Sequence, residues 1–178
     1  RVDVYGLLSA ERSLYALVAG SAGEQVPILG VAGRPADHCQ DPCGAAKKQG
    51  LDKKGGKEAA GGVICCSGKK YICVWKPGEA TNPRAVAIVT KCIIEHESDH
   101  LDDLDCPRFW CYGFPTRPPF KKEKRQSANA EECSAYKIEL NCLQSNRSQC
   151  GGDHQCESEV DLEIHFLTDE RNKRNCPP

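Results

Sequence analysis

The stretch that decides the fold is "CIIEHESDHLDDL", which runs from Cys92 to Leu104 and contains the pattern His96-Glu97-x-x-His100. Residues four apart lie on the same face of an α-helix, so this spacing lets two imidazoles bind one metal ion. The apolar residues beside the pattern predict an amphipathic helix that packs in a core. The stretch therefore predicts a zinc-binding helix with His96 and His100 as ligands.

The glutamate inside this pattern has a chemical role of its own. It lies next to the first zinc ligand, where it can take a proton from a water molecule that the metal activates. The same carboxyl group can pass the proton to the leaving amine when an amide bond is cleaved. We therefore expect Glu97 to be the general base of a zinc hydrolase.

A catalytic zinc site needs a third protein ligand, which must come from another segment. None of the other histidines fits the H-E-x-x-H-x-x-G-x-x-H spacing. The segment "ANAEECSAYKIELNCL" predicts a second helix, on which Glu132, Ala135 and Glu139 share one face. Small Ala135 allows a close approach of the first helix. Glu132 is our first candidate for the third ligand, and Glu139 is the alternative.

Two tyrosines are candidates for stabilising a transition state. A phenol near the metal can donate a hydrogen bond to the oxyanion of a tetrahedral intermediate. Tyr136 and Tyr112 could take this role. The alternative for each is a half-buried aromatic side chain with its hydroxyl group in water.

The cysteine content indicates where the protein is used. The chain has 13 cysteines in 178 residues, which predicts a disulfide framework and an oxidising, secreted environment. Cys39-x-x-x-Cys43 and the pair Cys65-Cys66 with Cys73 lack the paired CxxC spacing of structural zinc sites. The odd number leaves at least one cysteine outside the intramolecular bridges.

Charge and hydropathy argue against two classes of partner. The net charge is −1, so there is no general basic field and we expect no nucleic-acid partner. No apolar run is long enough for a membrane span. The chain begins at Arg1, contains no Met and shows no signal peptide, which indicates a fragment or processed product of a longer polypeptide.

The remaining segments predict a mostly helical α+β domain that is stapled by disulfides. Residues 1–38 are predicted to be an arm or linker from a larger chain, with helical spacing up to Gly20, and residues 39–178 one domain. Residues 44–61 are rich in Gly, Lys and Ala and predict a mobile loop. The predicted elements are a hairpin of Val63–Cys66 and Tyr71–Trp75 and helices at 85–104, from Ser127 or Asn129 to Leu143, and after Asp153.

Three segments also carry a resemblance to a known family. "CIIEHESDHLDDLDC", "EECSAYKIELNCL" and "CGGDHQC" resemble the metallopeptidase toxin domains of bacterial polymorphic toxins, including the Rhs-, PAAR- and VgrG-linked effectors of type VI secretion. The resemblance covers about Val63 to Cys156. His96, Glu97 and His100 match the family's HExxH motif, and Glu132 matches its Glu-Cys-x-Ala-Tyr helix.

The resemblance implies a fold and a biological role. The fold would be zincin-like, and the activity would be zinc-dependent cleavage of a protein or peptide substrate. The domain would be an antibacterial effector that is delivered to a target cell, with the periplasm as its site of action. A cognate immunity protein would be its partner.

Two other functions remain open from the sequence. The first is a cysteine-rich secreted binding module, because the acidic residues around the two histidines are also typical of a solvated helix face. The second is a zinc amidase that acts on peptidoglycan peptides. An extended groove beside His96 would favour protein substrates, and a closed pit would favour a small amide.

Overall fold

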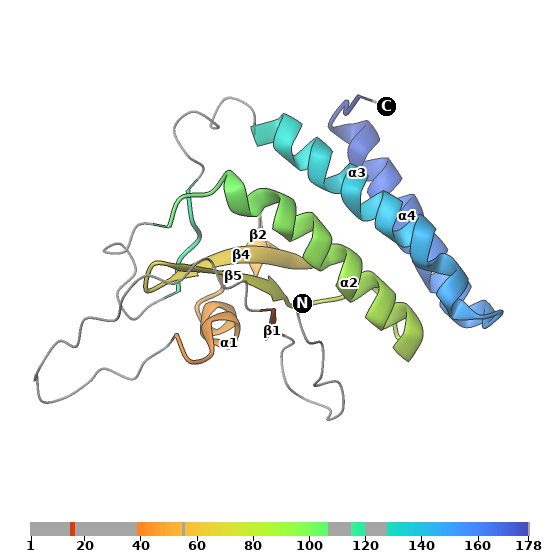
Figure 1. Ribbon diagram of the computed structural model, residues 1–178, viewed down its shortest axis with the longest axis horizontal. Helices are drawn as coiled ribbons and strands as arrows, with labels where there is room; N and C mark the ends of the chain where they lie inside the picture. The colour runs from red at the N-terminus through yellow and green to blue at the C-terminus, as the bar shows by residue number, and fades with distance from the viewer. Residues whose placement is uncertain (1–14, 17–38, 55, 107–114, 120–127, 178) are drawn as a thin grey trace, which may run out of the picture.

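A small antiparallel sheet separates one short helix from three long ones in this computed structural model (Figure 1). The structure describes residues 15–16, 39–54, 56–106, 115–119 and 128–177. Its elements, in chain order, are β1 (Tyr15–Ala16), α1 (Pro42–Lys48), β2 (Lys53–Lys54), β3 (Lys57–Glu58), β4 (Gly61–Cys66), β5 (Lys69–Val74), α2 (Pro83–Asp99), the 3-10 helix η1 (His100–Asp102), α3 (Ala128–Asn146), the 3-10 helix η3 (Arg147–Cys150) and α4 (His154–Lys173). The expected α+β class and the predominance of helix are confirmed.

The sheet is built on the predicted hairpin. β4 and β5 pair antiparallel, and Ser67 and Gly68 form the two-residue turn between them with φ angles of 50° and 76°. Positive φ at both turn positions matches the right-handed twist of the strands. β1 pairs with the other side of β5 in the order β1-β5-β4. The helical prediction up to Gly20 is therefore wrong at Tyr15–Ala16, and the rest of that segment lies outside the described residues.

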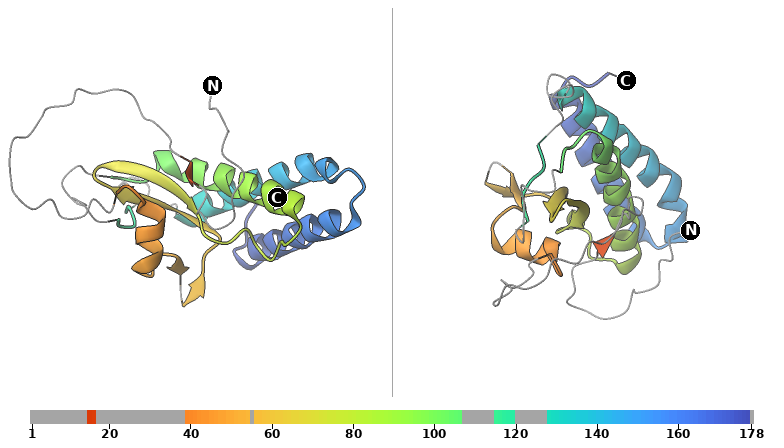
Figure 2. Two further views of the ribbon diagram at one scale, coloured as in Figure 1. Left: turned by 90° about the horizontal axis from the view of Figure 1, so that it is seen from below. Right: turned by 60° about the vertical axis from the view of Figure 1, so that its left-hand side comes forward.

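The face of the sheet opposite α2 is covered by α1 (Figure 2). Asp41 caps α1 by accepting a hydrogen bond from the backbone N–H of Gly44, and Pro42 begins the helix. The prediction of a mobile loop over residues 44–61 is wrong, since α1 continues to Lys48 and β2 pairs with β3. A cap and a disulfide at Cys43 fix this segment despite its composition.

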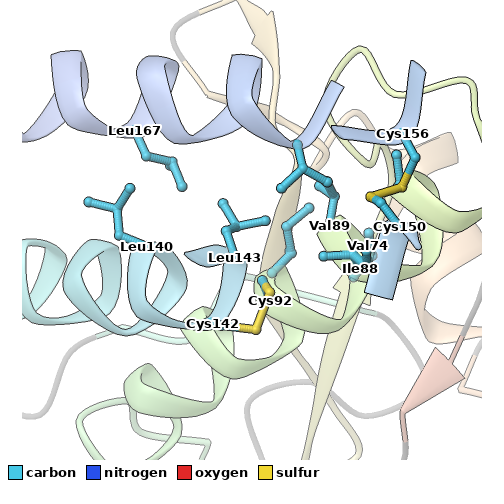
Figure 3. Packing of buried hydrophobic residues seen from close by; sticks show 13 residues of the cluster. Val74, Ile88, Val89, Cys92, Leu140, Cys142, Leu143, Cys150, Cys156 and Leu167 are labelled. Atoms are coloured by element: carbon cyan, nitrogen blue, oxygen red, sulfur yellow. A yellow bond between two sulfur atoms is a disulfide. The ribbon is translucent and has the colours of Figure 1, made fainter. Parts of the chain in front are cut away.

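The other face of the sheet is covered by α2, and α3 and α4 pack beyond it (Figures 1 and 2). The apolar faces of the three helices form the main core, with Val89, Cys92 and Leu143 fully buried (Figure 3). Asn82 caps α2 and Asp153 caps α4, each accepting two backbone N–H groups. The cap at Asp153 confirms the predicted start of α4, whereas α2 begins at Pro83, two residues before the start predicted for it.

Six disulfides link this fold and involve twelve of the thirteen cysteines, while Cys111 lies outside the described residues. Three of them tie α1, the sheet and the segment after η1 together, and the other three lie among the long helices. The pairs are Cys39–Cys66, Cys43–Cys73, Cys65–Cys106, Cys92–Cys142, Cys133–Cys176 and Cys150–Cys156. The framework fits an oxidising environment and so a secreted protein, as the cysteine content predicts.

No helix in the described ranges combines the length and apolar character that crossing a bilayer requires.

Candidate metal centre

Two histidines at the end of α2 form the first part of the centre. His96 lies in the last turn of α2, and His100 follows as the first residue of η1. Helical spacing places both rings on one side, with their centroids 5.1 Å apart. The two residues are 8% and 7% exposed, so both imidazoles are removed from bulk water.

α3 supplies the acidic part of the centre. Glu132, Tyr136 and Glu139 fall at i, i+4 and i+7 and therefore share a helix face. Buried Ala135 lies on the same helix and leaves room for close packing against α2. The Cys92–Cys142 disulfide joins the two helices about one turn from His96 and Glu139.

Three side chains converge to form a possible metal-binding group. The candidate ligand atoms of His96, His100 and Glu132 all lie within 4.8 Å of one another. Two imidazoles and a carboxylate are the ligand set of many catalytic zinc sites. The group that the sequence predicts is thus brought together from α2, η1 and α3 and could hold a metal ion.

Glu139 takes a different position from the one considered as an alternative ligand. Its Oε2 lies 2.8 Å from Nδ1 of His96, and both side chains are buried. This contact engages Nδ1 of His96 and leaves Nε2 as the ring nitrogen available to a metal ion. A carboxylate on the outer nitrogen orients the ring and makes the inner nitrogen a stronger ligand.

The electrostatic environment of the centre favours a cation. Burial alone lowers the pKa of His96, because it disfavours the charged ring. The hydrogen bond with Glu139 and the negative charges of nearby glutamates outweigh burial, so the pKa lies above its ordinary value. The negative charges of Glu97, Glu132 and Glu139 around the ring suit a bound cation, and His96 would lose its proton on binding a metal ion.

Glu97 lies where α2 closely approaches Gly61 at the start of β4. A Cβ atom at Gly61 would lie 3.2 Å from Oε1 of Glu97 and 2.6 Å from Cγ2 of Ile93. A glycine at the start of β4 is therefore required for this close approach. Glu97, His96 and Gly61 all line a pocket of about 340 Å³ beside the metal-binding group.

Tyr136 also lines this pocket, and its ring centroid lies 5.1 Å from that of His96. Burial and the charge of Glu132 raise the pKa of the Tyr136 phenol. The group stays protonated at neutral pH and is able to donate a hydrogen bond. Tyr112, the other predicted candidate, lies outside the described residues.

Two features of the pocket were missed by the sequence reasoning. The sequence places Gly61 at the end of the predicted mobile loop, although a glycine in a strand often marks a close backbone approach. Glu163 of α4 lines the pocket as well. Its signal was its spacing from Val160 and Leu167, which puts an acidic residue on the buried stripe of that helix.

Comparisons with known proteins add no relative. No protein-family model matches the sequence, and no curated protein or solved structure is significantly similar to it. Function therefore has to be inferred from the residues and geometry of the centre.

Proposed function

We propose that the protein is a zinc-dependent metallopeptidase. The observation that carries this proposal is the convergence of His96, His100 and Glu132, with Glu97 in the pocket beside them. When bound, Zn²⁺ polarises a carbonyl group and lowers the pKa of a water molecule. A helix with an HExxH motif packed on an antiparallel hairpin also supports a zincin-like fold.

The residues around the centre divide the remaining work. Glu97 takes the proton of the attacking water and gives it to the leaving amine. Tyr136 donates a hydrogen bond to the oxyanion that develops on the cleaved amide. Glu139 holds the ring of His96 through Nδ1 and fixes which nitrogen faces inward.

The edge of the sheet supports a peptide as the substrate. Among the described residues, β4 pairs along its length only with β5, and Thr116 bridges to it at Cys65. The stretch from Gly61 to Val63 lines the pocket, and no strand in the described part of the chain pairs with its other side. An extended peptide can add to such an edge through backbone hydrogen bonds. This open arrangement favours a peptide chain over a small amide.

Metal content tests the centre directly. Purified protein reconstituted with Zn²⁺ should hold about one zinc per chain by elemental analysis. His96→Ala and Glu132→Ala should lose the metal, while Glu131→Ala, one residue away on α3, should keep it. Zinc retained in Glu132→Ala would place the third ligand elsewhere. A wild type that binds no zinc would leave a disulfide-built binding module as the better reading.

Activity tests the chemistry separately. Glu97→Gln should keep the zinc and lose roughly 100- to 10,000-fold in cleavage of a fluorescent casein substrate, since only proton transfer is removed. Unchanged cleavage in this variant would contradict the assigned general base. Cleavage of peptidoglycan stem peptides but not of casein would favour the amidase.

The proposed biological role is a secreted antibacterial effector with a cognate immunity protein. The resemblance of residues 63–156 to polymorphic-toxin metallopeptidases supports it, and so does the disulfide framework, which suits an oxidising periplasm. Export of the protein to the periplasm of a bacterial host should stop growth. The same export of Glu97→Gln should not, and equal growth with both proteins would argue against a toxin.

A further inference from the structure

The pocket beside the metal-binding group adjoins a second one. The second pocket also measures about 340 Å³ and shares Ala60, Glu163 and Phe166 with the first. Its apolar wall includes Leu162 and Phe166, which are 58% and 54% exposed. The second pocket thus combines the carboxyl group of Glu163 with an apolar wall.

Glu163 lies at the junction of the two pockets with its carboxyl group against the backbone. A Cβ atom at Gly78, whose φ is +58°, would lie 2.2 Å from Oε2 of Glu163, so only a glycine fits there. No hydrogen bond or ion pair to Glu163 is formed by any residue that the structure describes. Burial, together with the charges of Glu139 and Glu79, raises the pKa of Glu163 to about 7.

The other charges of the second pocket are already matched. Lys76 forms a salt bridge with Glu79. Glu159 accepts hydrogen bonds from the backbone N–H groups of Thr81 and Asn82 and from two side chains. Within the described residues, Glu163 is thus the carboxyl group of this pocket that a new cation could pair with.

We propose that the second pocket is a substrate subsite for a lysine or arginine side chain, whose stem packs on Leu162 and Phe166 and whose cation pairs with Glu163. Lysine and arginine combine an apolar stem with a charged end, as this pocket requires. A purely apolar side chain would leave Glu163 buried without a partner, and an acidic one would be repelled by it. This inference rests on the proposed peptidase function, because it names the kind of peptide that the same site accepts.

Binding of two small probes tests the subsite without requiring catalysis. N-acetyl-arginine amide and N-acetyl-leucine amide are titrated into zinc-reconstituted protein and followed by NMR chemical shifts. We expect the arginine probe to bind at least about tenfold more weakly to Glu163→Gln than to wild type, because a charge-assisted contact is lost. Binding of the leucine probe should be the same in both. Asp169→Asn removes an exposed charge of α4 outside both pockets and should change neither.

Cleavage of a peptide library then separates this inference from the proposed function. A preference for basic residues that disappears in Glu163→Gln would support both. Binding of arginine that depends on Glu163, without cleavage of any peptide, would support the subsite and contradict the peptidase. An arginine probe that does not bind the wild type, or that binds Glu163→Gln equally well, would overturn the subsite whatever the enzyme cleaves.

Discussion

The helical part and the sheet part of the molecule are held together by different means. The helical part, α2 to α4, shares a continuous core of thirteen buried residues with Val74 at the end of β5. The sheet part, α1 with β4 and β5, has two small clusters: one of four buried residues, of which two are the bonded cysteines Cys43 and Cys73, and one of three that includes Leu104. Apolar packing therefore dominates in the first part, and covalent links carry more of the stability in the second.

The difference bears on the candidate metal centre. The three possible ligands lie on α2, η1 and α3, within or beside the helical part. The facing wall of the pocket, which includes Gly61 and Val63, belongs to the sheet part. The well-packed part thus positions the three possible ligands, while the cross-linked part presents the edge strand that we propose for the substrate.

The largest expected effect comes from removing the central link of the sheet part. The double variant Cys43→Ala/Cys73→Ala should lose about 3.5 kcal/mol of unfolding free energy, because the bridge closes a long loop. Hydrogen exchange should show lost protection in β4 and β5 and retained protection in α3 and α4.

A matched link in the helical part gives the control. Cys150–Cys156 closes a much shorter loop, so its replacement by two alanines should cost about 2 kcal/mol. If the Cys43–Cys73 variant lost protection equally in both parts, the two would unfold as one unit and the contrast between them would be wrong.

The helical part should instead be sensitive to its core. Leu143 is fully buried between the helices, and Leu143→Ala should cost about 3 kcal/mol in urea unfolding through lost burial and the cavity left behind. Leu162→Ala removes the same side chain from an exposed position and should cost less than about 0.5 kcal/mol. Similar losses in both variants would show that the packing of α4 on α2 and α3 is not the source of stability.

Glu163 should weaken the helical part as the pH rises. Its pKa is near 4.5 in the unfolded chain. In the folded protein, burial and the charges of Glu139 and Glu79 raise the pKa to about 7, while the charge of Lys76 opposes this rise. Both states are protonated below pH 4.5. Between pH 4.5 and 7 only the unfolded state ionises, so the native state loses stability as the pH rises.

Glu163→Gln removes this titration. In metal-free protein, the variant should be as stable as wild type at pH 4 and about 2 kcal/mol more stable at pH 8. This difference is smaller than the pKa shift alone would give, because Glu163 is partly exposed and water screens its charge. Urea unfolding of wild type and variant at pH 4 and pH 8 measures these free energies. Asp169→Asn on the exposed side of α4 should show no such pH-dependent gain, and a variant less stable than wild type at pH 8 would contradict the assignment.

The smallest expected effect concerns the contact between α2 and α3. Glu139→Gln keeps an acceptor for Nδ1 of His96 but removes the charge, so the affinity for zinc should fall only about tenfold, at the low end for such changes. Competition with a chelator measures this affinity. Glu95→Gln, which removes a charge of α2 outside the pocket, should leave it unchanged. A loss of all zinc in Glu139→Gln would instead make Glu139 a ligand.

Much of the helical part follows from local signals, and much of the sheet part does not. Asn82 and Asp153 mark helix starts, and the i, i+4 spacing of His96 and His100 predicts a shared face. For α1, the segment composition favoured a loop, and the cap at Asp41 and the link to Cys73 outweigh it. A helix of seven residues gains little from propensity alone, so contacts distant in sequence decide whether it forms.

The centre divides in the same way. Glu132 could be chosen from helix periodicity, because the choice requires only that the acidic face of α3 packs against the histidine face of α2. The separate position of Glu139 depends on which nitrogen of His96 points outward, and no local pattern encodes that. The place of Glu163 depends on how α4 lies against the pocket, which is set by packing of the whole helical part.

The pattern of disulfides has a further consequence for how the chain tolerates cutting. Of the six described bridges, Cys92–Cys142 is the one that joins the residues before Cys106 to those after Cys133. A single nick between Cys106 and Ala128 would therefore give a two-chain protein whose halves stay covalently attached. His96 and His100 would remain on one chain and Glu132 on the other, so that after reduction of this one bond the centre would depend on non-covalent contacts alone to stay assembled.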